Sequence, residues 1–150
     1  MLELLGKKIG EGTTRVVHTH IRNPALVIKV AKSDLGTNAN FVESEIWSYA
    51  SPRDRKYFAP VEDWSDDYKY LVMHRTYPIL FDDDDDEAVD EELMDLQEMF
   101  PQYLTDFTEH NIGGIEDRIV MHDYAEITWR LSGGRDSKTI QDCLEAYTIR

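Results

Sequence analysis

The sequence has a single cysteine and no long apolar run. Cys143 alone cannot form a disulfide within the chain or supply the several thiolates of a cysteine-built zinc site. No apolar stretch approaches the roughly 20 residues that a membrane-spanning helix requires, and residues 1–6 are too short and too acidic for a signal peptide. We therefore expect a cytoplasmic protein that does not interact with a membrane.

Lys and Arg are missing from residues 76–117. This stretch holds 15 Asp or Glu residues, whereas the rest of the chain holds 15 acidic and 16 basic ones. The net charge of -14 therefore belongs to one segment, and it disfavours direct binding to nucleic acid. A solvated loop and helix flank explain such a run most simply. A docking surface for a basic host protein is the other interpretation.

The patterning predicts an α+β fold in one domain of 150 residues, with a hydrophobic content of 41% that is ordinary for a globular protein. Five runs have the alternating or continuous apolar pattern of strands: residues 5–9, 16–21, 25–30, 57–61 and 68–73. A turn at residues 65–67 precedes the last of them. One helix lies between the third and fourth strands, on the apolar spacing of Val42, Ile46, Tyr49 and Ala50. Asn38 or Asn40 can cap it.

The second half predicts helices around a short β-hairpin. After the acidic run at residues 82–87, an apolar stripe predicts a helix over residues 88–104, which Pro101 kinks or ends. Two short strands around a Gly113-Gly114 turn follow, and a last helix covers residues 137–147.

Gly10, Gly12 and Lys29 suggest a phosphate site among the first strands. Glycine has no Cβ, so the backbone at Gly10 and Gly12 can bring its N–H groups close to phosphate oxygens, although glycine pairs also occur in plain hairpin turns. Lys29 lies inside an apolar strand and needs a carboxylate partner, for which Glu43 and Glu45 compete. Such a pair either leaves the ammonium group to hold phosphates or is a structural salt bridge.

Asp106, Asn111 and Asp123 form a second constellation. Asn111 follows Asp106 by five residues, and Asp123 ends a short apolar run. Their oxygens suit a proton acceptor and two ligands of Mg²⁺, whereas each residue taken singly is explained as a turn cap.

Together these motifs resemble the protein-kinase-like superfamily. IGEGTTRVV at residues 9–17 resembles the glycine-rich loop, LVIK at residues 26–29 the strand that carries the ATP lysine, and ESEIW at residues 43–47 the helix that carries its partner. YLVMHR at residues 70–75 is similar to the strand that enters the adenine-binding hinge. Asp106, Asn111 and the triplet at residues 123–125 match the catalytic base and the metal-binding positions. Glu43 fits better than Glu45, because the family's apolar spacing then follows it.

The resemblance implies an ATP- and Mg²⁺-dependent phosphotransferase that acts on protein Ser/Thr hydroxyls. The implied catalytic residues are Asp106, Lys29 and Glu43; the nucleotide-binding residues are Gly10, Gly12, Lys29, Met73 and Arg75; the metal ligands are Asn111 and Asp123. It also implies a five-stranded antiparallel small-lobe sheet with one helix over residues 1–75, an acidic linker over 76–90, and a reduced, mostly helical second lobe with a short hairpin over 91–150.

Several positions depart from the family pattern. Arg15 replaces the third loop glycine and either crowds the phosphates or contacts them. Leu104-Thr105 replaces a His-Arg pair, Ala125 replaces a glycine, and only 25 residues follow Ala125, so the usual peptide-binding platform is not expected. A small bacteriophage or viral kinase-like protein in the host cytoplasm is the implied context. Two alternatives stay open, namely a pseudokinase module that binds nucleotide or a partner without transferring phosphate, and an acidic decoy for a basic host protein.

Overall fold

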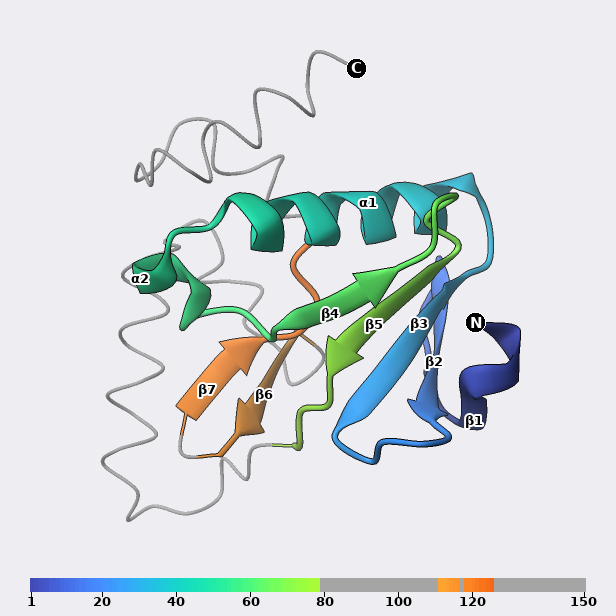
Figure 1. Ribbon diagram of the computed structural model, residues 1–150, viewed down its shortest axis with the longest axis horizontal. Helices are drawn as coiled ribbons and strands as arrows, with labels where there is room; N and C mark the ends of the chain where they lie inside the picture. Colours follow the sequence, from blue (N-terminus) through green and yellow to red (C-terminus); the bar gives the residue numbers. More distant parts are fainter. Residues whose placement is uncertain (79–110, 117, 126–150) are drawn as a thin grey trace. The chain divides into compact units, whose positions relative to one another are not determined.

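The computed structural model describes residues 1–78, 111–116 and 118–125 of the chain (Figure 1). Its architecture is α+β, which confirms the predicted fold class: a five-stranded antiparallel sheet with one main helix, and a separate two-stranded sheet. The chain divides into two compact units, the first of which holds residues 1–48 and 60–75. The second includes residues 49–59 and the described residues from 76 onward. The predicted helices at residues 88–104 and 137–147 lie outside the described residues.

The first unit is built on a sheet with the strand order β1-β2-β3-β5-β4, and all neighbouring strands are antiparallel. The short 3-10 helix Leu2–Leu4 precedes five strands: β1 (Leu5–Glu11), β2 (Arg15–His20), β3 (Leu26–Ala31), β4 (Val61–Trp64) and β5 (Tyr70–His74). Lys29 in β3 lies opposite Val17 in β2 and opposite Leu71 in β5. Directly opposed residues share one face of a sheet, so Lys29 has apolar neighbours on both sides.

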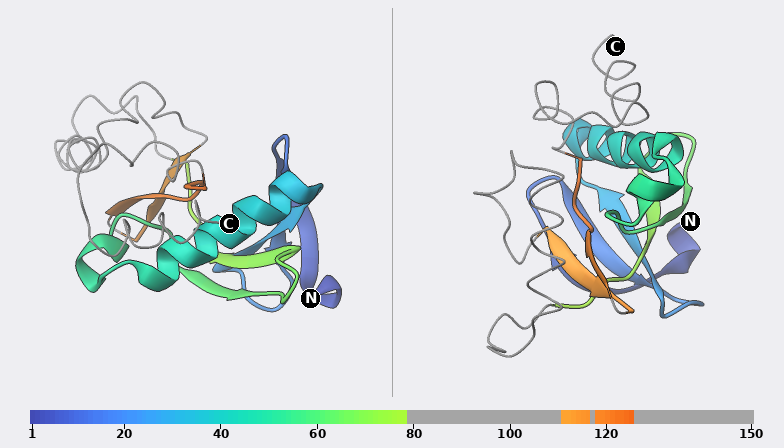
Figure 2. Two further views of the ribbon diagram at one scale, coloured as in Figure 1. Left: turned by 90° about the horizontal axis from the view of Figure 1, so that it is seen from above. Right: turned by 90° about the vertical axis from the view of Figure 1, so that its left-hand side faces the viewer.

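The main helix, α1 (Asp34–Tyr49), runs along one side of this sheet, as Figure 2 shows. It buries Phe41, Val42 and Ile46, each of which stabilises the unit by roughly 2 kcal/mol relative to an exposed side chain. The predicted cap at Asn38 or Asn40 is wrong, because the helix begins at Asp34. The first turn of the helix shows no apolar residues at helical spacing, so the sequence does not indicate where the helix begins. The helix ends before residues 51–52 as predicted, but Tyr49, expected on the apolar face, is 47% exposed.

The second unit contains α2 (Pro52–Arg55), β6 (Ile112–Ile115) and β7 (Arg118–Met121). Residues 57–59 run beside β7, since the Met121 N–H donates to Tyr57 O at 2.9 Å and the Ala59 N–H donates to Met121 O at 2.8 Å. The predicted strand at residues 57–61 is therefore wrong: its first part pairs with β7, and β4 begins only at Val61. Pro60, which has no N–H to donate to a ladder, separates the two parts.

The predicted Gly113-Gly114 turn is also wrong, because both glycines lie within β6. The chain reverses around Glu116, whose φ is 54°. Tyr77 forms an antiparallel bridge with Gly114, with hydrogen bonds of 3.0 and 2.8 Å in the two directions. Gly113 lies close to Thr76 of the neighbouring segment, since a Cβ at 113 would lie 2.5 Å from the Thr76 hydroxyl oxygen. Among the described residues, no helix is long and apolar enough to cross a membrane.

Candidate functional site

Lys29 and Glu43 form a buried ion pair between β3 and α1. Lys29 Nζ lies 2.9 Å from Glu43 Oε1, and the two residues are 5% and 0% exposed. Glu43, rather than Glu45, is thus the carboxylate partner of the strand lysine. The pair satisfies the requirement that a cation within an apolar strand be neutralised.

Arg15 binds the same carboxylate. Its Nη1 lies 2.7 Å from Oε1 of Glu43 and its Nη2 lies 3.0 Å from Oε2, which is the two-pronged geometry that guanidinium groups make with carboxylates. Arg15 is 7% exposed and points towards α1. Neither sequence-based alternative, crowding or contacting phosphates, describes this arrangement. Strand alternation could have indicated this contact. Arg15 lies two residues before Val17, which is opposite Lys29, so the side chains of Arg15 and Lys29 lie on the same face of the sheet.

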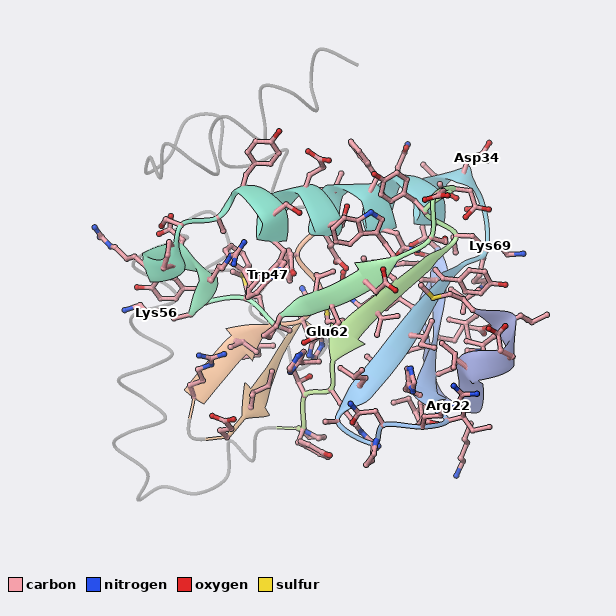
Figure 3. The ribbon with its side chains drawn as sticks, in the orientation of Figure 1. Arg22, Asp34, Trp47, Lys56, Glu62 and Lys69 are labelled. Carbon is pink, nitrogen blue, oxygen red and sulfur yellow. The ribbon has the colours of Figure 1, made fainter. Side chains whose placement is uncertain are left out.

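Asn40 is the second residue that the sequence analysis missed. It is fully buried one helical turn before Glu43, and its Oδ1 accepts a hydrogen bond from Arg15 Nη1 at 3.1 Å. Its Nδ2 donates to Tyr68 O at 2.9 Å and to Lys69 O at 3.2 Å. Asn40 therefore connects the cluster to the β4–β5 turn. Figure 3 shows Lys69 of that turn at the same end of the sheet as Asp34, where α1 begins.

The cluster keeps Glu43 ionised. Burial raises the pKa of the Glu43 carboxyl, but the charges of Arg15 and Lys29, together with their hydrogen bonds, outweigh burial and lower the pKa from 4.5 to about 2. The carboxylate is therefore charged at neutral pH, and it can orient both cations at once.

The turn between β1 and β2 is fastened to the start of α1. The Gly12 N–H donates to Arg15 O at 2.8 Å and closes the turn, while Lys32 donates from its backbone N–H to Thr14 O at 2.8 Å and from Nζ to Gly12 O at 3.2 Å. Gly10 and Gly12 have no positive φ. A Cβ would lie 3.7 Å or more from its nearest neighbour at Gly10 and 3.9 Å at Gly12. The fold therefore does not require glycine at either position.

The two predicted hinge residues lie at the end of β5. Met73 is fully buried and lies between Val27 of β3 and Val61 of β4. The Arg75 N–H donates to Ala25 O at 2.7 Å. The Met73 side chain thus belongs to the interior of the first unit.

Asn111 and Asp123 are brought together in the second unit. The Asn111 carbonyl accepts hydrogen bonds from the N–H groups of His122 at 2.9 Å and Asp123 at 3.4 Å. Asp123 is exposed, and the next residue, Tyr124, is buried with its hydroxyl donating to Ala59 O at 3.0 Å. The two oxygen-bearing residues therefore stand side by side at the base of the β6–β7 hairpin.

The remaining catalytic prediction, Asp106, lies outside the described residues, as does the acidic run at residues 82–87. Within the described part of the chain, no group of three or more His, Cys, Asp or Glu residues is placed to hold a metal ion. Mg²⁺ bound with phosphates needs only one or two protein oxygens, so this finding does not test the prediction that Asn111 and Asp123 are its ligands.

No model of a known protein family matches the chain, and no curated protein matches it either, so any functional conclusion depends on the residues and contacts described above.

Proposed function

We propose that the protein is an ATP- and Mg²⁺-dependent phosphotransferase of protein-kinase-like fold, which transfers phosphate to protein Ser/Thr hydroxyls. The observation that carries this proposal is the buried ion pair between Lys29 of β3 and Glu43 of α1. A buried ion pair usually stabilises a fold no more than apolar residues of similar size would, because both charges must leave water. Stability alone therefore does not explain the presence of this pair. A strand lysine and a helix glutamate held in this way suit the binding of phosphate groups.

Gly10 near the end of β1 and Gly12 in the β1–β2 turn support the same conclusion. Gly10 and Gly12 lie next to the cluster along the chain, and the fold has room for a side chain at both. Glycine costs conformational entropy on folding, so its presence where neither φ nor packing demands it needs another reason. Close approach of the backbone to a phosphate group is such a reason.

Each residue has a defined part in the proposed reaction. Lys29, aligned by Glu43, holds the phosphates, and the backbone around Gly10 and Gly12 covers them. Asn111 and Asp123 would hold Mg²⁺, which would supply positive charge to the phosphate oxygens. Asp106 accepts the proton of the attacking hydroxyl. Met73 and Arg75 are the positions for the adenine end of the nucleotide.

The proposal is tested by incubating the protein with γ-labelled ATP, with and without Mg²⁺, in the presence of host lysate. Wild type should release or transfer label only with Mg²⁺, and Asp123→Ala should abolish this activity. Asp66→Ala, in the exposed β4–β5 turn, is the control and should retain it. Equal background rates in wild type and Asp123→Ala would remove the catalytic proposal.

Thermal unfolding separates an active enzyme from a binding module. Nucleotide at 100 times its dissociation constant should stabilise the protein by about 2.7 kcal/mol. Stabilisation by Mg²⁺-ATP without transfer of label would identify the chain as a pseudokinase module, for which the binding of the Arg15 guanidinium group to Glu43 is the favouring observation.

A further inference from the structure

Arg15 joins three parts of the first unit. It begins β2 directly after the turn at residues 12–14, its guanidinium group binds both oxygens of Glu43 on α1, and it also contacts Asn40. The carboxylate oxygen Oε1 of Glu43 accepts from Arg15 and from Lys29 at once. A movement of Glu43 away from Lys29 would therefore also break its contacts with Arg15.

The turn itself has further attachments to the same region. Lys32 donates to the carbonyls of Gly12 and Thr14, and the Thr14 carbonyl lies so close to Gly36 that a Cβ there would be only 2.2 Å away. The first turn of α1 thus packs directly on the backbone of the β1–β2 turn. Arg15 adds a charged, buried contact to this junction.

We propose that Arg15 is a positioning residue, which fastens the β1–β2 turn to α1 and holds Glu43 in place so that Lys29 is aligned for a phosphate group before any nucleotide binds. The part that concerns phosphate rests on the proposed function. The benefit is preorganisation, since a lysine already held by its partner loses less side-chain freedom when the ligand arrives. Arg15 acts on the nucleotide only through Glu43 and Lys29.

The test is a double-mutant cycle on nucleotide affinity, with a fluorescent ATP analogue and Mg²⁺ as the probe. Arg15→Met should weaken binding about tenfold, the equivalent of one charge-assisted hydrogen bond, and Arg15→Lys should weaken it less. Arg22→Met is the matched control, because Arg22 is exposed in the β2–β3 turn (Figure 3). In a Lys29→Met background, Arg15→Met should have no further effect. Equal losses in both backgrounds would mean that Arg15 contacts the ligand directly and would overturn the proposal.

Hydrogen exchange without nucleotide tests separately whether Arg15 fastens the β1–β2 turn to α1. In Arg15→Met, and more weakly in Arg15→Lys, amide exchange should accelerate at residues 12–15 and along α1, whereas Arg22→Met should leave it unchanged. Unchanged exchange in Arg15→Met would overturn the fastening role. A wild type that binds no nucleotide would overturn the proposed function, while the exchange measurement would still decide whether Arg15 holds the turn.

Discussion

Gly113 lies against Thr76 so closely that a Cβ atom at position 113 would be 2.5 Å from the Thr76 hydroxyl oxygen and 2.6 Å from its Cβ. The same atom would lie 3.0 Å from Nδ1 of His122, which is itself 2.6 Å from the Thr76 hydroxyl. The absence of a side chain at Gly113 therefore leaves room for the Thr76 and His122 side chains. This packing lies next to the residues proposed to hold Mg²⁺.

Gly113→Ala should destabilise the protein by about 1–3 kcal/mol, because Thr76 has to move away from the added methyl group. Urea unfolding followed by circular dichroism measures the loss. Gly114→Ala is the control, since its Cβ would meet nothing closer than 3.8 Å and its cost should be below about 1 kcal/mol. Equal costs at the two positions would show that the close contact with Thr76 is not real.

Glu43→Gln should destabilise the protein by about 3–5 kcal/mol, because it leaves Arg15 and Lys29 without their shared carboxylate in a buried position. Glu45→Gln, two residues along the same helix and partly exposed, should change stability by less than about 0.5 kcal/mol. The two variants are compared by denaturant unfolding at neutral pH. A larger loss in Glu45→Gln would contradict the assignment of the ion pair.

The stability of the protein should depend on pH through the protonation of Glu43. Its pKa in the folded protein is lowered to about 2 from 4.5, so the unfolded chain binds more protons as the pH falls. The stabilisation is fully present above about pH 4.5 and is lost progressively as the pH falls towards 2; in total it amounts to about 3 kcal/mol. Unfolding free energies of wild type and Glu43→Gln, measured between pH 7 and pH 3, should therefore converge on acidification. A constant difference would exclude a depressed pKa.

The sequence predicts a carboxylate partner for Lys29, because a cation within an apolar strand must be neutralised, but the choice of Glu43 over Glu45 comes from the resemblance to the kinase-like family. It does not predict Arg15 as a third member, because a loop position carries no periodicity and its face is fixed only once β2 is known to begin there. The start of α1 is missed for a related reason. Gly36 is required by a tertiary contact with Thr14 O, and such a contact leaves no local pattern.

The errors around residues 57–61 and 113–114 have one cause. Local apolarity and turn chemistry identify extended segments, but they do not specify the partner with which each segment pairs. Residues 57–59 pair with β7, and Gly113-Gly114 lies beside Thr76 and Tyr77, through contacts of long sequence separation. The adjacency of Asn111 and Asp123 depends on the same hairpin, so it also follows from tertiary pairing.

Lys29→Met should separate ligand binding from folding. Glu43 keeps its two hydrogen bonds to Arg15 in this variant, so the loss in unfolding free energy should be smaller than in Glu43→Gln. Affinity for Mg²⁺-ATP should fall at least tenfold, measured by titration calorimetry, since the charge proposed to hold the phosphates is gone. Lys7→Met, on exposed β1, is the control and should bind as wild type. Unchanged affinity in Lys29→Met would exclude this lysine from the nucleotide site.

Gly12→Ala should weaken nucleotide binding without changing stability, whereas Gly36→Ala should lower the stability of the protein. A Cβ at Gly12 would have 3.9 Å of clearance, so Gly12→Ala should leave the unfolding free energy within about 0.5 kcal/mol of wild type. If a phosphate approaches this backbone, the methyl group should nevertheless weaken Mg²⁺-ATP binding.

Gly36→Ala places its Cβ 2.2 Å from the Thr14 carbonyl, a backbone atom that cannot swing aside, and should cost about 1–3 kcal/mol. Chemical denaturation and nucleotide titration of both variants check the pair of effects. A Gly12→Ala protein that is stable and binds nucleotide normally would show that no phosphate comes close to the turn, because the added methyl group would then obstruct neither folding nor ligand.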